Sequence, residues 1–413
     1  MNKKYKNKLG SLRSSKNNLI FDKIAKKTMN IFIISILLNL VFQSITIAEK
    51  PNEGPKIISE AAILIEESSG RVLYEKNAER LMYPASLTKV ATAIYAIEKG
   101  NLEDLVTVSE RARQVDGTRV YLEVGEKVSL RKLIQGLLIN SGNDAGVAIA
   151  EYLDGSEEEF AASINDYLQG IGLNRTHFVN PHGLFNPDHT TTARDLAVIT
   201  QYSMKNADFR EIFGTKELKW DREVWDTTIY NHHKLMRERP YEGITGGKTG
   251  FVDESKHTLI TTAKRDNMSV IAVVLKGQSQ DMIYNDTVEL LDYAFNNFNL
   301  VTIPKGKEYS LNGKKFVTNE MYSFPITNNE EITEEITQEG LFEIKNQFQE
   351  NIVTLPINEI KTPKIKEEKQ IMEEKNGVFG SLNAFIIIAI LATLSSLIFI
   401  KIKKKRLRLR KPW

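Results

Sequence analysis

Residues 84–91 read PASLTKVA and place a serine, Ser86, three residues before a lysine, Lys89, at the start of a helical pattern. Apolar residues then recur at the spacing of one helix face as far as Ile97, and Gly100 supplies a stop. Side chains at i and i+3 leave the same face of a helix, so the amine can reach the hydroxyl. The same residues are also typical of a helix cap followed by a surface lysine, and only the rest of the chain distinguishes the two interpretations.

Strand-turn-strand patterns lie on both sides of this helical region. Residues 61–66 (AAILIE) and 71–74 (RVLY) flank one turn, and residues 258–263 (TLITTA) and 269–275 (SVIAVVL) flank another. Helical periodicity covers residues 130–139, 144–153, 157–170, 192–204 and 287–298. Strands at both ends with helices in the middle predict an α+β fold, in which an antiparallel sheet is assembled from the two ends and helices cover its faces.

The ends and the middle of the chain carry opposite charges. The formal net charge is +2, but residues 1–29 hold nine Lys/Arg and one acid, and residues 401–413 hold eight Lys/Arg and no acid. Subtracting these two ends of +8 leaves −14 on the remainder. A nucleic-acid-binding protein would gather its basic residues on the folded body, so this distribution argues against a nucleic-acid partner.

An apolar run adjoins each basic end. Residues 31–47 (IFIISILLNLVFQSITI) lead into small residues placed as in a signal-peptidase site, so residues 1–48 indicate a basic leader and signal peptide. An uncleaved membrane anchor is the alternative. Residues 384–400 (AFIIIAILATLSSLIFI) hold no charge and predict a transmembrane helix at 383–400. Because basic flanks stay in the cytoplasm, we expect residues 401–413 to form a cytoplasmic tail and the body to lie outside the cytoplasmic membrane.

The chain has no cysteine, which excludes disulfides, thiolate nucleophiles and Cys-zinc sites. An exported body without disulfides must be stabilised by its own core, and a bacterial protein is favoured. The residue pattern changes near residue 300, where short apolar runs alternate with Gly, Asn and Glu. We therefore expect a main folded domain at 55–298, a small β-rich module at 300–360 and a charged stalk at 361–382.

Two further polar clusters lie between the predicted elements. Residues 141–144 (SGND) present a hydroxyl and a carboxamide after a predicted helix, although such residues are also an ordinary turn and cap. Residues 246–250 (GGKTG) place an ammonium beside glycines that let a backbone pass close to a ligand. Residues 243–249 nearly match a phosphate-binding loop, but the match is one residue too short and no apolar strand precedes it. We exclude that interpretation.

Taken in order, Ser86-x-x-Lys89, Ser141-x-Asn143 and Lys248-Thr249-Gly250 resemble the three motifs of the penicillin-recognising serine enzymes. The longer context resembles the low-molecular-weight D-alanyl-D-alanine carboxypeptidases, in residues 83–89 (YPASLTK), 136–145 (GLLINSGNDA), 176–184 (THFVNPHGL) and 246–251 (GGKTGF). The resemblance covers residues 55–298. It implies a β-lactamase/transpeptidase-like domain, to which this chain would add the small β-rich module and the C-terminal transmembrane helix.

The resemblance also implies an acyl-transfer cycle on a peptidoglycan stem peptide that ends in D-Ala-D-Ala. Ser86 would attack the carbonyl between the two D-alanines, and Lys89 would be its general base. Ser141 would relay a proton to the leaving amine, and water would then release the shortened peptide. β-Lactams would be inhibitors, and neither a metal nor an organic cofactor would be required.

The same resemblance assigns substrate-binding roles to Asn143, Lys248, Thr249, Gly250 and Phe251. Asn143 would hold the substrate amide and the catalytic lysine, and Lys248 would help to bind the terminal carboxylate. The oxyanion would rest on the backbone N–H groups of Ser86 and Phe251.

One position departs from the family pattern. Similar enzymes carry an arginine shortly before the closing helix that contributes to carboxylate recognition, and in a rough alignment Ile283 takes its place. Either Lys276 compensates for that arginine or the enzyme is slow on D-Ala-D-Ala. Histidines at 177 and 182 are expected to brace their loop rather than bind a metal, because no carboxylate lies beside them at ligand spacing. Those at 232 and 233 are expected at the surface.

Two other functions stay open on this scaffold. A class A β-lactamase would carry a Glu-x-x-Leu-Asn loop between the second and third motifs, and nothing between Ser141 and Lys248 fits it. A weakly active or non-hydrolytic wall-binding protein would keep the fold, and the missing arginine supports it. We expect the carboxypeptidase, in a bacterial cell membrane with its catalytic domain on the extracytoplasmic side. The sequence does not determine the oligomeric state.

Overall fold

The structure, a computed structural model, describes residues 54–222, 225–337, 341–360 and 389–398, together with Met29 and Lys401. Apart from those two residues, the predicted leader and signal peptide (1–48), the stalk (361–382) and the basic tail (401–413) lie outside the described residues. Of the predicted transmembrane segment (383–400), residues 389–398 are described and are helical. Within the described ranges, no helix has both the length and the apolar composition that a membrane crossing requires.

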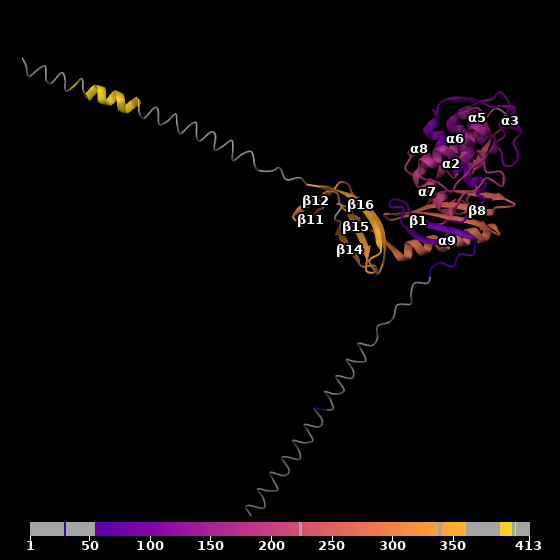
Figure 1. Cartoon of the computed structure of the whole chain (residues 1–413). Helices are drawn as coiled ribbons and strands as arrows, with labels where there is room; N and C mark the ends of the chain where they lie inside the picture. Colours follow the sequence, from indigo (N-terminus) through magenta and orange to yellow (C-terminus); the bar gives the residue numbers. More distant parts are fainter. Residues whose placement is uncertain are drawn as a thin grey trace, which may run out of the picture.

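A central antiparallel sheet underlies the main domain (Figure 1). Its strands are β1 (Ala61–Glu66), β2 (Val72–Lys76), β7 (Ile244–Val252), β8 (Lys256–Arg265) and β9 (Met268–Gly277). They lie in the order β2-β1-β9-β8-β7. The first strand pairs with the last, so that Leu64 faces Ala272. The two ends of the domain therefore build one sheet, and the predicted α+β architecture is confirmed.

Both faces of this sheet are buried, so its central strands are apolar throughout. In β1, Ile63 and Ile65 belong to the core on one face, whereas Ala62 and Leu64 belong to the core on the other. Successive side chains of a strand point to opposite faces, and this alternation divides the strand between the two cores. Helix α9 (Gln280–Asn297) closes the second core, and Figure 1 shows it on the opposite side of the sheet from the other helices.

The other helices form a layer above the first face (Figure 1). Two of them start at serine caps. Ser129 accepts a hydrogen bond from the backbone N–H of Lys132, and Ser156 accepts one from that of Glu159. The helices that follow these caps have the predicted bounds, because the cap and the apolar periodicity are both local in the sequence. The layer comprises α2 (Thr88–Lys99), α3 (Glu110–Gln114), α4 (Leu130–Ile139), α5 (Asn143–Asp154), α6 (Glu157–Gly170), α7 (Ala193–Ser203) and α8 (Ala207–Phe213), with the 3-10 turn η1 (Ala85–Leu87). A second 3-10 turn, η2 (Lys234–Met236), contributes Leu235 to the core that α9 closes.

The closing helix begins earlier than predicted. We expect residues 287–298 from the apolar pattern, but α9 begins at Gln280, after the cap Ser279. Its first two turns mix polar and apolar residues, and within them Asp286 is buried and accepts hydrogen bonds from the backbone N–H groups of Ile58 (3.0 Å) and Ser59 (2.7 Å). A partner more than two hundred residues away explains this buried carboxylate, and no local pattern reveals it.

The glycine-rich residues 246–250, which the sequence places ahead of the second hairpin, lie within strand β7 itself. Two of these glycines are required by close neighbours. A Cβ at Gly246 would lie 2.5 Å from the Phe213 ring, and one at Gly247 would lie 2.2 Å from the His233 ring. Glycine in a strand interior commonly marks such close approaches.

Two small two-stranded sheets and a β-rich segment lie outside the central sheet. In the first small sheet β3 (Leu105–Thr107) pairs with β4 (Lys127–Ser129), which follows it only after α3, and in the second β5 (Glu217–Asp221) pairs with β6 (Asp226–Tyr230). Strands then occupy the region in which the sequence predicts a small β-rich module. In that region β10 (Phe298–Ile303) pairs with β13 (Tyr322–Thr327), and a second sheet has the order β11 (Glu308–Leu311), β12 (Lys314–Thr318), β16 (Asn351–Glu359), β15 (Leu341–Asn346) and β14 (Ile332–Ile336).

One ion pair ties this β-rich segment to the main domain. The Arg71 guanidinium lies 2.9 Å from a carboxylate oxygen of Glu330 and also donates to the carbonyl of Pro325. The Glu330 side chain is only 6% exposed. A charge so well buried depends on its partner, so the contact links the two parts of the chain.

Candidate active site

The turn that carries Ser86 is strained and tightly held. Ala85 has φ +50°, a left-handed conformation that is uncommon for residues other than glycine. Gly183, at φ +86°, packs directly on this turn, because a Cβ there would lie 1.9 Å from the Ala85 carbonyl oxygen. On the other side, the Thr258 hydroxyl donates to the carbonyl of Pro84 at 3.0 Å. The sequence motif alone indicates neither support, although Gly183 lies in a segment that carries the family resemblance.

Lys89 is buried with its amine beside the serine. Its Nζ lies 2.8 Å from Ser86 Oγ and 2.7 Å from the carbonyl oxygen of His182. Burial, followed by the charge of Lys248, lowers the pKa of Lys89 well below its usual value, and Asp144 opposes the shift. The neutral amine is therefore favoured, and a neutral amine can accept the hydroxyl proton.

A second lysine–serine pair lies near the first. The Lys248 ammonium donates to Ser141 Oγ at 2.9 Å and to the carbonyl of Thr249 at 2.8 Å. Burial lowers the pKa of Lys248 to about 7. Ser141 has φ +61° at the joint between α4 and α5, which turns the hydroxyl toward the lysine. The structure thus brings together Ser86, Lys89, Ser141 and Lys248 from three separate segments.

Asn143 does not hold Lys89 as expected. Its carboxamide nitrogen donates to the carbonyl of Asp116 at 2.6 Å, and its backbone N–H donates to the carbonyl of Thr118 at 2.7 Å. The Lys89 amine is satisfied instead by Ser86 and by the carbonyl of His182. Asn143 begins α5 and anchors the neighbouring loop.

Asp144, which the sequence suggests only as part of a turn, organises the same loop. Its buried carboxylate accepts hydrogen bonds from the backbone N–H groups of Val120 (3.0 Å) and Leu122 (3.1 Å). Burial raises the pKa of Asp144, and these hydrogen bonds oppose the rise. The loop of residues 116–122 is therefore fixed against the second motif. An acid placed on the buried face of a helix is the sequence signal that could have revealed this role.

Strand β7 supplies the remaining predicted residues. It is the last strand in the sheet order, and η1 packs on it at Gly250. A Cβ at Gly250 would lie 3.0 Å from the backbone nitrogen of Ser86, so glycine is needed for this approach. Thr249 precedes it, and Phe251 follows with half its surface exposed and its ring 4.7 Å from that of His257. An edge strand next to a nucleophile can pair with an extended peptide.

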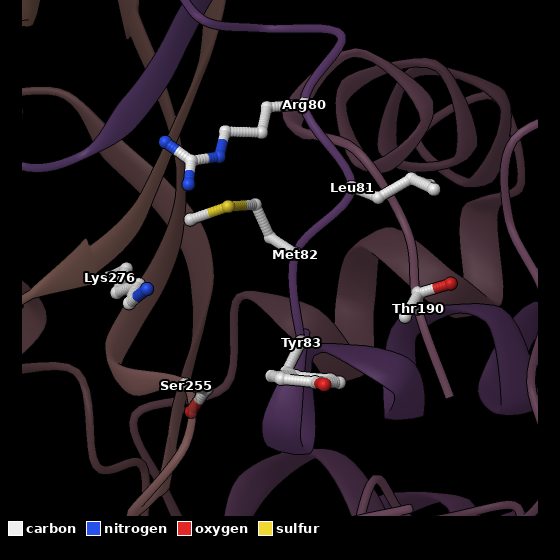
Figure 2. Close-up of a pocket in the computed structure, with 7 residues that line it drawn as sticks. All are labelled: Arg80, Leu81, Met82, Tyr83, Thr190, Ser255 and Lys276. Atoms are coloured by element: carbon white, nitrogen blue, oxygen red, sulfur yellow. The ribbon is translucent and has the colours of Figure 1, made fainter. Parts of the chain in front are cut away.

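Lys276 does not join this cluster. It lies with Arg80, Met82 and Tyr83 around a cavity of about 230 Å³ (Figure 2). Its ammonium pairs with Glu60 at 3.0 Å, and Arg80 pairs with the same carboxylate at 2.6 Å. The expectation that Lys276 compensates for the missing arginine therefore finds no geometric basis.

Ile283 is an apolar packing residue. It is 2% exposed, and a Cβ at Gly277 would lie 2.2 Å from its side chain. At this position, the start of α9 thus offers no charge to the cleft.

His177, His182 and His233 have structural partners, whereas His232 is exposed as predicted. The ring of His177 contacts the carbonyl of Asp188 at 2.9 Å, and that of His182 contacts Glu157 at 3.1 Å, so both brace their loop as predicted. His233 contradicts the expected surface position. It is fully buried, because the glycine opposite leaves room for its ring, and its Nε2 lies 2.7 Å from the hydroxyl of Thr261. In the part of the chain that the structure describes, no group of three or more metal-ligating side chains occurs.

Comparisons with known proteins agree with this geometry. The model of the peptidase S11 family, described as D-alanyl-D-alanine carboxypeptidase, matches residues 46–279. The chain is 33% identical over 285 residues to D-alanyl-D-alanine carboxypeptidase DacF of Bacillus subtilis, which covers 66% of this chain and 72% of the relative. It is 31% identical over 310 residues to D-alanyl-D-alanine carboxypeptidase DacA of Haemophilus influenzae. This alignment covers 69% of this chain and 75% of the relative.

Solved structures give the same result. Penicillin-binding protein 5 from Haemophilus influenzae superposes with a TM-score of 0.67 at 25% identity, covering 74% of this chain and 98% of that one. Penicillin-binding protein 6B from Escherichia coli gives a TM-score of 0.63 at 27% identity, covering 75% and 97%. The match spans the sheet, the helical layer and all three polar motifs, so the chain belongs to the peptidase S11 family of D-alanyl-D-alanine carboxypeptidases.

Proposed function

We propose that this enzyme removes the terminal D-alanine from peptidoglycan stem peptides through an acyl-enzyme at Ser86, in cell-wall biosynthesis and remodelling. The observation that carries the proposal is the buried Lys89 amine, 2.8 Å from Ser86 Oγ. Burial favours the neutral form of this amine, which a general base requires.

In the acylation step, Ser86 Oγ attacks the carbonyl carbon between the two D-alanines while Lys89 takes the hydroxyl proton. The backbone N–H groups of Ser86 and Phe251 stabilise the oxyanion. Ser141 then relays the proton to the nitrogen of the leaving D-alanine, and the C–N bond breaks. Lys248, 2.9 Å from Ser141 Oγ, stabilises negative charge that develops on this oxygen.

In the deacylation step, water attacks the ester carbonyl. The water proton passes through Lys89 back to Ser86 Oγ, and the shortened peptide leaves with a new carboxylate. Asn143, Thr249 and Gly250 line the substrate in this scheme, the last two along the free edge of β7. The cycle uses only residues of this chain and water.

Covalent labelling tests the nucleophile. A fluorescent penicillin should acylate the purified domain at Ser86, and the S86A variant should remain unlabelled. The matched control is S310A in the β-rich segment, which removes an exposed serine hydroxyl far along the chain and should label normally. Labelling of S86A, or release of no D-alanine from a synthetic pentapeptide by the wild type, would contradict the proposal. Rapid turnover of nitrocefin would favour a β-lactamase instead.

We further propose that the enzyme is held in the bacterial cytoplasmic membrane with its catalytic domain outside. The support is the uncharged apolar segment 384–400 followed by eight basic residues. Removing residues 383–413 should move the protein from the membrane fraction to the soluble fraction if the N-terminal signal is cleaved. Retention in the membrane would indicate that the N-terminal apolar run is an anchor.

A further inference from the structure

The proposed substrate ends in a carboxylate, and the buried lysine of the third motif is a weak partner for it. Burial lowers the pKa of Lys248 to about 7, which weakens the hold of this amine on its charge near neutral pH. Its hydrogen bonds already go to Ser141 and to the carbonyl of Thr249. Recognition of a carboxylate therefore calls for a second cation at the edge of β7.

Most cations near this edge are engaged. Arg239 pairs with Asp281 at 3.0 Å, and Lys276 pairs with Glu60. The guanidinium of Arg237 lies over the ring of a neighbouring tyrosine and donates to a backbone carbonyl. Each of these charges would have to leave a partner in order to bind substrate.

Lys234 differs from them. It begins η2 and is half-buried, and among the residues that the structure describes its ammonium has no hydrogen-bond or ion-pair partner. Its backbone is nevertheless fixed, because its N–H donates to the Tyr284 hydroxyl at 2.8 Å. The preceding residue, His233, packs its ring against Gly247, one residue before Lys248. The turn that carries Lys234 is thus anchored directly to the third motif.

The neighbours of Lys234 place it at the end of β7 that follows Thr249. Its charge contributes to the lowered pKa of His257, after burial, so the two side chains lie near each other. His257 is paired with Phe251 across the β7–β8 ladder, and their rings are 4.7 Å apart. The nearby part of α9 presents the apolar Ile283. Among the described residues, Lys234 is therefore a free cation near the Phe251 end of β7.

We propose that Lys234 binds the C-terminal carboxylate of the substrate and sets the preference of the enzyme for a free carboxyl terminus. This inference rests on the proposed function. A half-buried ammonium that lacks a partner among the described residues can form a charge-assisted hydrogen bond without first breaking another interaction. Lys234 acts in substrate binding, and the chemical steps stay with the two lysine–serine pairs.

The test compares K234Q with R239Q. Both variants remove one positive charge from the same corner, but Arg239 is already paired with Asp281. The backbone hydrogen bond from residue 234 to Tyr284 survives any side-chain change, so K234Q should fold. We expect K234Q to lower kcat/KM for an N-acetylated Lys-D-Ala-D-Ala peptide about tenfold or more, chiefly through KM. R239Q should change it less than about twofold, and K234R should restore most of the loss.

A second readout uses benzylpenicillin, which also carries a carboxylate. Its second-order acylation rate constant should fall in K234Q by a similar factor, while the unfolding temperature stays within about 2 °C of the wild type. Equal kcat/KM in K234Q and the wild type, or equal losses in K234Q and R239Q, would overturn the inference and leave the proposed function intact. A wild-type domain that neither releases D-alanine nor reacts with benzylpenicillin would overturn both.

Discussion

Replacing Gly183 with alanine tests whether the loop of residues 176–184 positions the nucleophile. Gly183 has φ +86°, and a Cβ there would lie 1.9 Å from the Ala85 carbonyl oxygen. Real Cβ atoms essentially never approach closer than 3.0 Å, so the loop or the Ser86 turn must move by about 1 Å. A displacement of that size at a reacting group can reduce a rate about a hundredfold.

Gly172 offers a matched control. Its φ is +91°, but no atom lies within 4 Å of the position that an added methyl group would take, so G172A carries only the conformational penalty. That penalty is about 1 kcal/mol, which corresponds to about 2–4 °C in the unfolding temperature of a domain of this size. G183A should carry the same penalty and, in addition, the cost of the clash.

Stopped-flow acylation by a fluorescent penicillin and thermal unfolding measure the two effects separately. We expect G172A to acylate at the wild-type rate and to lose a few degrees of stability. G183A should unfold at a lower temperature than G172A and acylate about a hundredfold more slowly. If G183A and G172A acylate at equal rates, the loop does not position Ser86 and the reasoning is refuted.

Three further predictions follow from buried charges. The variant K248M should lose activity and gain thermal stability relative to the wild type. The pKa of Lys248 is about 7 in the folded state and near its ordinary value when unfolded. The stability gained in K248M should therefore be full below about pH 7 and shrink as pH rises toward about 10. Differential scanning calorimetry at several pH values measures this dependence. Removing the Asp144 carboxylate in D144A leaves backbone N–H groups of residues 116–122 without partners, so urea unfolding should show a loss of about 2–4 kcal/mol; a change below about 0.5 kcal/mol would argue against the role of that carboxylate. R71A leaves Glu330 buried and unpaired, so limited proteolysis should cut the β-rich segment faster while penicillin labelling persists; unchanged proteolysis would show that the ion pair does not tie the two parts together.

Local signals explain which elements the sequence predicts well. Helices α4 and α6 match their predicted bounds because a serine cap and an apolar face mark each of them within a few residues. The predicted start of α9 was wrong because its first two turns interrupt the apolar pattern with Asp286, a buried acid whose partners are Ile58 and Ser59. Long-range hydrogen bonds leave no periodic pattern in the sequence.

The side chains of the site also divide into those whose contacts follow from local spacing and those whose contacts depend on distant segments. The motif spacing correctly indicates that Ser86 and Lys89 share a face, since i and i+3 geometry is a property of the helix. The expected contact between Asn143 and Lys89 was wrong, because the Asn143 carboxamide donates to the carbonyl of Asp116, whereas the Lys89 amine contacts Ser86 and the carbonyl of His182. The burial of His233 was also missed, because it depends on the space above Gly247 on a strand that is distant in the sequence.

The sequence by itself determined the α+β layout and the order of the three motifs. Periodicity, caps and turns are local, and they mark the two hairpins at the ends of the domain. Only the tertiary structure decided the chemistry. It pairs Lys248 with Ser141 near Lys89, and it buries Lys89 so that its pKa falls and the amine can act as a base. Desolvation depends on what packs around a group, and packing joins residues that the chain itself keeps far apart.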